Sequence, residues 1–143
     1  MSWNDFEKDC PDLASLGFEL LNRKIAYLAL LDEGGSPRIH PITPFIGNGM
    51  LFMFTEPSSP KIRDLQRDGR YALHCSVGGD DRLREFLVTG YAVVISDKEI
   101  RNQAVRIASS PVVLDIYVLF EFQITRVLVV DYDEEKNRTI HRW

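Results

Sequence analysis

The sequence predicts a mainly β, antiparallel barrel of about six or seven strands with small helices in its gaps. Short apolar runs rich in β-branched and aromatic residues recur along the chain, and Gly, Pro, Asn or Asp turns separate most of them. The helical stretches between these runs are too short to build a core alone. Because a closed sheet leaves no unpaired edges, a barrel suits this many short strands.

Length and composition favour one folded domain over residues 1–143. Compact domains most often hold about 100–150 residues, so a second core would be undersized. Hydrophobic residues make up 45% of the chain and charged residues 27%, a balance that excludes intrinsic disorder. The formal net charge of -4 lacks the basic excess of a general nucleic-acid binder, so we expect no nucleic-acid partner.

Cysteine usage and the lack of long apolar segments point to the cytoplasm. Cys10 and Cys75 are the only cysteines and lie far apart, so neither a disulfide framework nor a thiolate zinc site is predicted. The chain does not begin with a basic stretch followed by an apolar run, and no segment is long enough to span a bilayer. We therefore expect a cytoplasmic protein without a membrane or metal partner.

The first half of the chain predicts a short helix followed by a three-stranded meander. Leucines at helical spacing predict the helix, and apolar runs between turn residues predict the strands. Pro41 and Pro44 each remove a ladder donor and imply an edge strand or a bulge. The predicted elements are an N-terminal helical segment over residues 1–23 with its helix at Pro11–Asn22, and strands over Ile25–Leu31, Arg38–Ile46 and Met50–Thr55.

The second half of the chain predicts two more small helices and the remaining strands. Ser58–Pro60 offers a helix N-cap followed by proline in the first turn, and Ser96 and Glu99 form a capping box. We expect a turn over Gly78–Asp81 and a helix stop at Pro111. The predicted elements are a helix from Pro60 to near Gly69, strands over Arg70–Val77 and Glu85–Ile95, a helix over Asp97–Ser109, and strands over Tyr117–Phe122, Val127–Val130 and Thr139–Trp143.

The strongest local signal for function lies at Thr55–Leu65, where a strand end is followed by a helix start. Free amides in a first helical turn carry partial positive charge and attract anions. Ser58 or Ser59 can donate a hydrogen bond, and Lys61 and Arg63 add full charge. The segment therefore predicts a phosphate site, while a serine that merely caps a solvated helix is the alternative explanation.

The local charge balance favours the phosphate site. Residues 61–84 carry six basic and four acidic side chains, whereas the rest of the chain carries eleven basic and seventeen acidic ones. A cationic surplus confined to one stretch suits a single anionic ligand better than a long polyanion, with a solvated charged face as the alternative. His40, His74 and His141 do not show the spacing of a metal site.

Five pieces of the chain match a known family in sequence order. They are Ile25–Thr43, Leu51–Thr55, Ser59–Leu65, Gly69–Leu73 and Val88–Ala92. Together they resemble the FMN-binding split β-barrel family related to pyridoxamine 5′-phosphate oxidase, over nearly the whole chain. The resemblance implies a split-barrel homodimer with two flavin sites between its subunits and a small-molecule substrate.

The resemblance also implies a set of flavin-binding residues. Arg38 matches a phosphate-binding basic position on a strand that borders the flavin, and Phe54 and Thr55 match the strand end beside the ring. Ser59 and Lys61 match the phosphate-binding segment. The implied cofactor site comprises Arg38, Ile39, His40, Pro41, Ile42, Thr43, Phe54, Thr55, Ser59, Lys61, Arg63 and Glu85.

The sequence departs from the oxidases of this family at several positions. Thr43 and Pro60 stand where those enzymes often carry cations, and Glu85 falls near a glutamine that contacts the flavin ring. A carboxylate at that position would oppose a reduced, anionic flavin. The segment Thr139–Trp143 does not reproduce the longer tail that holds substrate in true pyridoxamine-phosphate oxidases, so vitamin oxidation is not the expected activity.

Four hypotheses about function stay open. The first is an FMN-dependent oxidoreductase that acts on an unidentified small molecule, since a flavin needs positioning more than acid–base groups. The second is a deazaflavin-dependent reductase. The third is a non-enzymatic flavin- or haem-binding module with His40 or His74 as an axial ligand. The fourth is a dimeric scaffold whose cofactor pocket has decayed.

Overall fold

The computed structural model describes residues 1–78, 83–109 and 115–143. Four small helices and eight strands alternate along these residues in a mainly β fold, as the sequence predicts. In chain order the elements are α1 (Trp3–Asp9), α2 (Pro11–Leu21), β1 (Ala26–Leu31), β2 (Pro37–Ile42), β3 (Phe45–Gly47), β4 (Met50–Thr55), α3 (Pro60–Arg67), β5 (Arg70–Cys75), β6 (Arg84–Val94), α4 (Lys98–Ala108), β7 (Val118–Tyr132) and β8 (Arg138–Arg142).

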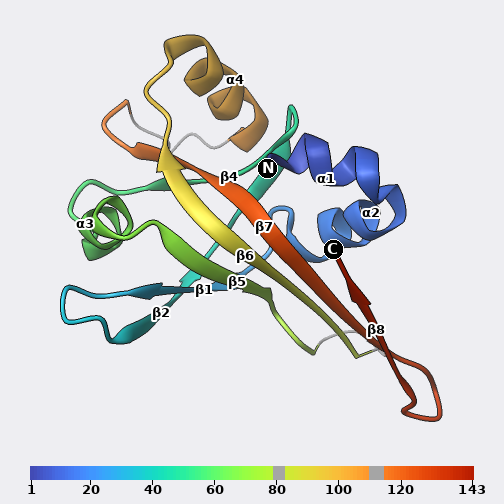
Figure 1. The fold of residues 1–143 in the computed structure, drawn as a ribbon. Coiled ribbons are helices and arrows are strands. Elements are labelled where there is room, and N and C mark those ends of the chain that lie inside the picture. The colour runs from blue at the N-terminus through green and yellow to red at the C-terminus, as the bar shows by residue number, and fades with distance from the viewer. Residues whose placement is uncertain (79–82, 110–114) are drawn as a thin grey trace.

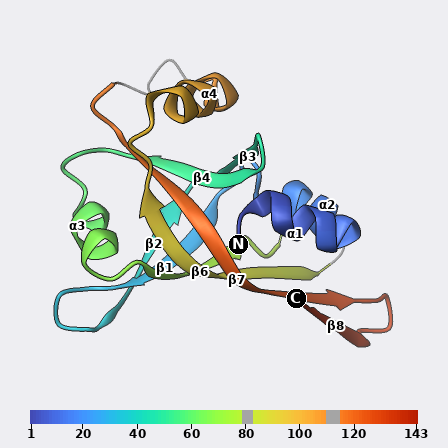
Figure 2. The same ribbon diagram turned by 45° about the horizontal axis from the view of Figure 1, so that its top comes forward.

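The strands form one curled antiparallel sheet (Figure 1). Its hydrogen-bonded order is β2-β1-β5-β6-β7-β4-β3, and β8 pairs with β7 off this path. Figure 2 shows α1 and α2 together on one side of the sheet, with α3 and α4 away from them. None of the helices in the described residues is both long and apolar enough to cross a membrane.

The N-terminal segment contains two helices where the leucine pattern predicts one. Pro11 occupies the first turn of α2, as expected. The additional helix, α1, begins after Ser2, whose hydroxyl accepts the Asp5 amide while the Asp5 carboxylate accepts the Ser2 amide. Ser-x-x-Asp at residues 2–5 is thus a capping box, and it is the sequence signal for this helix.

The strand predicted over Arg38–Ile46 is interrupted. β2 ends at Ile42, and the chain resumes as β3 at Phe45, which pairs with β4 at the far edge of the sheet. Pro44 lies in the gap, and its carbonyl accepts a hydrogen bond from the Arg23 amide at 2.9 Å. The edge position that the prolines imply is confirmed, because β2 and β3 are the two end strands of the sheet. Pro44 lies where the chain crosses from one of these edges to the other.

β7 is one long strand where two are predicted. It runs through the predicted gap between Phe122 and Val127 because Thr125 is an extra residue opposite a register shift at Gly90. This bulge leaves Thr125 and Arg126 both exposed, which breaks the alternation of apolar residues. The polar pair resembles a turn in the sequence but is a bend inside a strand.

The helix predicted from Asp97 is confirmed as α4, but its cap is not the predicted one. Asp97 is the N-cap, and its carboxylate accepts the Ile100 amide at 2.9 Å. The capping box predicted between Ser96 and Glu99 is therefore wrong, because the helix begins one residue later. The turn predicted over Gly78–Asp81 lies outside the described residues except for Gly78. The helix stop predicted at Pro111 also lies outside them.

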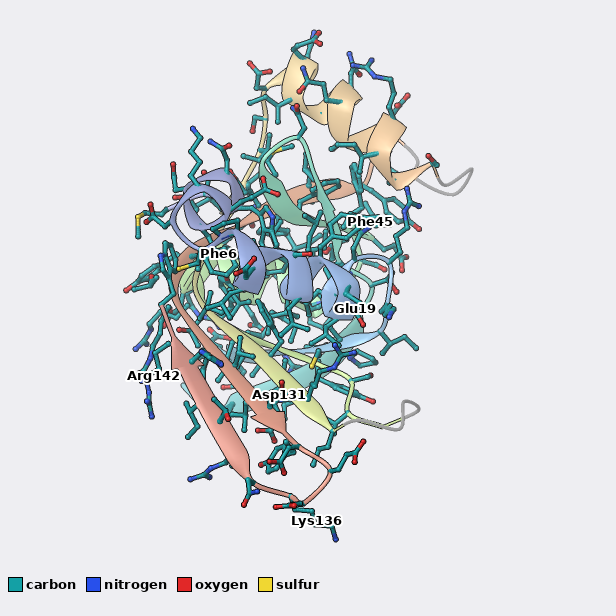
Figure 3. The ribbon with its side chains drawn as sticks, turned by 90° about the vertical axis from the view of Figure 1, so that its right-hand side faces the viewer. Phe6, Glu19, Phe45, Asp131, Lys136 and Arg142 are labelled. Atoms are coloured by element: carbon teal, nitrogen blue, oxygen red, sulfur yellow. The ribbon has the colours of Figure 1, made fainter. Side chains whose placement is uncertain are left out.

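Two apolar clusters hold the helices against the sheet. The larger one contains an aromatic group in which Phe6 contacts Trp3, Phe86 and Trp143, with ring centroids 4.9 to 6.4 Å apart. The smaller one lies under α4 and is built on Met50, Phe52, Ala104 and Leu119. Figure 3 shows Phe6 on α1 and the outlying β7–β8 hairpin with Lys136 at its turn.

Among the glycines of the described residues, Gly90 is the one at which a side chain is least tolerated. A methyl group there would overlap the backbone carbonyl oxygen of Gln123 on β7, and backbone atoms cannot rotate away. We expect Gly90→Ala to lower the free energy of unfolding by about 3 kcal/mol or more, measured by urea denaturation. Gly34→Ala, whose new methyl would meet Asp32 at an ordinary 3.4 Å, should change it by less than about 0.5 kcal/mol. Equal effects of the two changes would contradict the bulge.

Candidate functional site

A hollow of about 220 Å³ lies between the ends of β2 and β4 and the start of α3. It brings together seven of the predicted cofactor-binding residues from three separate stretches of the chain. These seven are Pro41, Ile42, Thr43, Phe54, Thr55, Ser59 and Lys61. Met53 and Glu56 line the hollow as well, although the sequence did not single them out.

A short turn places the start of α3 beside the end of β4. The Ser59 amide donates to the Glu56 carbonyl at 3.0 Å, and the Ser58 hydroxyl donates to the Glu56 carboxylate at 2.7 Å. Pro60 then supplies a backbone angle that suits the first helical position. The turn thus sets the hydroxyl of Thr55 and the first turn of α3 around one space.

Thr55 is buried, with 3% of its surface exposed, yet its hydroxyl has no hydrogen-bond partner among the described residues. Nearly all buried polar groups in proteins have a partner, and an unsatisfied one costs about 1–3 kcal/mol. Because Thr55 lines the hollow, a ligand there could accept this hydrogen bond.

Ser59 is the N-cap of α3 in position but not in hydrogen bonding. Its side chain makes no capping hydrogen bond to the first turn. The alternative in which this serine merely caps a solvated helix is therefore not what the structure shows. The hydroxyl remains available to the hollow, and so does the Lys61 amide. Pro60 has no amide hydrogen, and the Ile62 amide donates to the Ser59 carbonyl at 3.2 Å.

Lys61 supplies the positive charge of the hollow. Burial lowers the pKa of its ammonium group, and the nearby Glu56 carboxylate offsets part of this effect. Lys61 forms no ion pair within 4.0 Å in the part of the chain that the structure describes. A partly buried cation without a counter-ion favours an anionic ligand. Glu56 acts in the opposite direction because it would repel the same anion.

Arg38, the predicted phosphate-binding residue of β2, is held by an acidic side chain of α3. Its guanidinium donates to the Asp64 carboxylate at 2.8 Å, and Arg67 donates to the other oxygen at 2.9 Å. Arg67 also donates to the Leu31 carbonyl at 3.0 Å. This Arg38–Asp64–Arg67 cluster fastens α3 to β1 and β2, and Arg38 itself does not line the hollow.

The remaining predicted site residues lie outside the hollow. Ile39 is 69% exposed on the outer side of the sheet, and Arg63 is exposed on α3. His40 lies close enough to Lys61, which lines the hollow, for the two side chains to interact. Burial lowers the pKa of His40 most, and the positive charges of Lys61 and Arg38 lower it further. Its Nε2 atom is buried without a hydrogen-bond partner among the described residues.

Glu85 is the most remote of the predicted residues. It lies at the start of β6, opposite Val130, whereas the hollow lies near the other end of that strand, where Val94 pairs with Phe120 and Phe120 with Met53. Nine residue steps of about 3.3 Å separate Glu85 from Val94, which is on the order of 30 Å. Within one chain, Glu85 therefore does not join the other residues.

The composition of the hollow suits a phosphate group. The Thr55 and Ser59 hydroxyls, the Lys61 ammonium group and the start of α3 are all hydrogen-bond donors or positive charges. No group of three or more His, Cys, Asp or Glu side chains that could hold a metal occurs among the described residues. At about 220 Å³, the hollow is smaller than complete small-molecule pockets, which measure about 300–1,000 Å³.

Asp64 allows a test of the Arg38–Asp64–Arg67 cluster. Burial alone would raise the pKa of its carboxyl group, but hydrogen bonds from Arg67 and Arg38 outweigh burial and leave the pKa below its ordinary value of 3.8. A lowered folded-state pKa means that the stabilisation is complete above pH 3.8 and is lost as the pH falls through the folded-state pKa. We expect Asp64→Asn to destabilise the protein by about 1–3 kcal/mol at pH 7, and by less in acid.

Denaturation curves of the two proteins over a pH series measure this difference. Asp9→Asn, at an exposed position on α1, is the matched control and should change stability by less than about 0.5 kcal/mol at every pH. A gap between wild type and Asp64→Asn that stays constant from pH 7 down to pH 3 would show that the cluster does not titrate as described.

Comparisons with known proteins agree with this fold. A NimC/NimA family protein from Clostridium acetobutylicum superposes with a TM-score of 0.68 at 16% identity, over 99% of this chain and 94% of that one. A FAD-binding protein from Mesorhizobium loti gives 0.68 at 20% identity, over 84% and 95%. A haem-binding protein from Mycobacterium smegmatis gives 0.65 at 16% identity, over 84% of this chain but only 53% of that one.

The family can be stated from the sequence match. No curated protein matches the chain. The sequence model of the family described as pyridoxamine 5′-phosphate oxidase matches residues 18–131, which is well over half of the chain and includes every residue that lines the hollow. The chain therefore belongs to the pyridoxamine 5′-phosphate oxidase family.

Proposed function

We propose that this protein binds FMN and acts as an oxidoreductase on a small molecule. The observation that carries the proposal is the hollow at the start of α3, which Thr55, Ser59 and Lys61 line. Among the described residues, the buried Thr55 hydroxyl has no hydrogen-bond partner, the Ser59 side chain makes no capping hydrogen bond, and Lys61 forms no ion pair. A phosphate monoester carries close to two negative charges at pH 7 and accepts several hydrogen bonds. Membership of the family, and a fold shared with a FAD-binding protein, support a flavin as the carrier of that phosphate.

Different residues of the hollow would contact different parts of such a cofactor. The Thr55 and Ser59 hydroxyls donate hydrogen bonds to phosphate oxygens, and Lys61 neutralises their charge. Pro41 and Phe54 provide apolar surface beside them. A bound flavin supplies the exchange of hydride and electrons, so the protein's task is to position it and control access. Such a role needs no catalytic triad motif.

We further propose that a second copy of the chain completes the site. A hollow of about 220 Å³ has room for an anionic group but not for a whole flavin. The strand registers place Tyr27, Ile39 and Tyr91 on the same outer side of the sheet, where they are 46%, 69% and 54% exposed. Exposed apolar surface of this kind favours a protein partner. A Glu85 side chain that contacts the flavin would then have to come from the second copy, because Glu85 of the same chain lies far from the hollow.

The compartment that we propose is the cytoplasm. Cys10 and Cys75 are both free thiols, and Cys75 is buried with its sulfur accepting the Phe86 amide at 3.2 Å. Free thiols persist in reducing compartments.

The dimer can be tested by changing its proposed face. We expect the wild-type protein to sediment as a dimer at micromolar concentration. Ile39→Asp should raise the dimer dissociation constant at least tenfold, because it buries a charge against an apolar partner surface. Ile116→Asp, at a 65% exposed position outside the sheet, should leave the dissociation constant unchanged. A wild-type protein that sediments as a monomer would rule out the proposed assembly.

The flavin can be tested by absorbance and by titration. Freshly purified protein should show a flavin spectrum, and added FMN should lose fluorescence on binding. Lys61→Ala should weaken FMN binding by about 1–3 kcal/mol, because it removes a charged phosphate contact. Lys8→Ala, an exposed lysine on α1, is the matched control and should leave the affinity unchanged.

Other spectra would identify the alternative cofactors. A Soret band would indicate a haem protein, for which His40 or His74 is the candidate ligand. Tighter binding of a deazaflavin than of FMN in parallel titrations would indicate a deazaflavin reductase. Protein without a chromophore that also fails to quench FMN fluorescence would show that the flavin proposal is wrong and that the hollow belongs to a non-binding scaffold.

A further inference from the structure

Glu121 is a buried charged side chain that lies away from the phosphate hollow, which is the proposed phosphate site lined by Thr55, Ser59 and Lys61. Glu121 lies on β7 between Phe52 of β4 and Val93 of β6, and only 9% of its surface is exposed. Its carboxylate accepts a hydrogen bond from the Gln123 amide at 3.4 Å. No cation lies within 4.0 Å of it in the residues for which a structure is described. A buried carboxylate is normally paired with a cation, because its desolvation costs several kcal/mol.

Glu121 lines a hollow of about 640 Å³ between the start of α1, the β3–β4 turn and the start of α4. This volume is in the range of small-molecule pockets. Side chains alternate along a strand, so Glu121 shares its side of the sheet with Leu119, which packs with Met50 under α4. Met50 and Ile100 line the same hollow and give it an apolar wall.

Two amide side chains add polar atoms to this hollow. Asn48 uses its Nδ2 atom to donate to Gln103, which leaves its Oδ1 atom as an acceptor. Asn4 lies against Gly49 at the β3–β4 turn, and its backbone amide donates to the Gly49 carbonyl at 3.0 Å. This hydrogen bond does not use the Asn4 side chain, which lines the hollow. The hollow thus combines one negative charge, amide oxygens and an apolar wall.

We propose that this second hollow binds a small organic ammonium ion. The ammonium group would pair with the Glu121 carboxylate and donate to the Asn4 and Asn48 amide oxygens, and its hydrocarbon part would contact Met50 and Ile100. The hollow shares no lining residue with the phosphate hollow, which lies at the opposite end of β4. The proposal therefore goes beyond the flavin function and does not depend on it.

A titration monitored by amide chemical shifts tests this site. We expect benzylammonium to shift the amide signals of Asn48, Gly49 and Ile100 saturably at pH 7. Benzyl alcohol has the same shape without the charge, so it should bind at least tenfold more weakly to the wild-type protein. Glu121→Gln keeps the size of the side chain, and it should weaken benzylammonium binding at least tenfold.

Two further variants serve as controls. Glu7→Gln removes an exposed carboxylate on α1 and should leave benzylammonium binding unchanged. Lys61→Ala should also leave it unchanged, so a failure of the flavin proposal is distinguishable from a failure of this one. Equal binding of the ammonium ion and the alcohol to the wild-type protein, unweakened binding to Glu121→Gln, or shifts confined to other regions would each overturn the proposal.

Discussion

The Asp64 carboxylate, held between Arg38 and Arg67, is the interaction on which the candidate cofactor site depends. Helix α3 has only eight residues, and a helix of this length is marginal in water without tertiary contacts. Its apolar side consists of Ile62 and Leu65, which bury the helix but do not fix its direction. The two arginines supply that direction, because they attach the middle of α3 to β1 and β2. The first turn of α3 is then held over the end of β4.

This attachment changes the role of the cation on β2. The resemblance to the oxidase family implies that Arg38 contacts the phosphate directly, and that contact stays a prediction. In the structure the guanidinium is bound to Asp64, so its visible role is to position α3. The charge nearest the hollow is then Lys61, whose ammonium group has no such partner among the described residues. Positioning and charge neutralisation are therefore carried out by different residues.

The sequence was a good guide where function lies in contiguous segments and a poor one where it depends on long-range partners. Thr55, Ser59 and Lys61 are close in the chain, so a strand end and a helix start were enough to place them together. The Arg38–Asp64 pair joins residues far apart in the sequence, and no local sequence pattern predicts it. The bulge at Thr125 was missed for a related reason, since a break in alternation has the same sequence pattern whether the strand ends or bends.

β4 separates two hollows of opposite charge. Lys61 lies beside its end at Thr55, and Glu121 lies opposite Phe52 of this strand. Three residue steps of about 3.3 Å separate Phe52 from Thr55, or roughly 10 Å. That distance is close to the Debye length at physiological ionic strength, which is about 8 Å. Salt therefore weakens the interaction between the two charges through solvent, but it screens that interaction much less through the protein interior. The buried Phe52 and Met53 lie between the two ends and keep that interior apolar. Because the two hollows share no lining residue, one strand borders a proposed anion site and a proposed cation site that are made of different side chains.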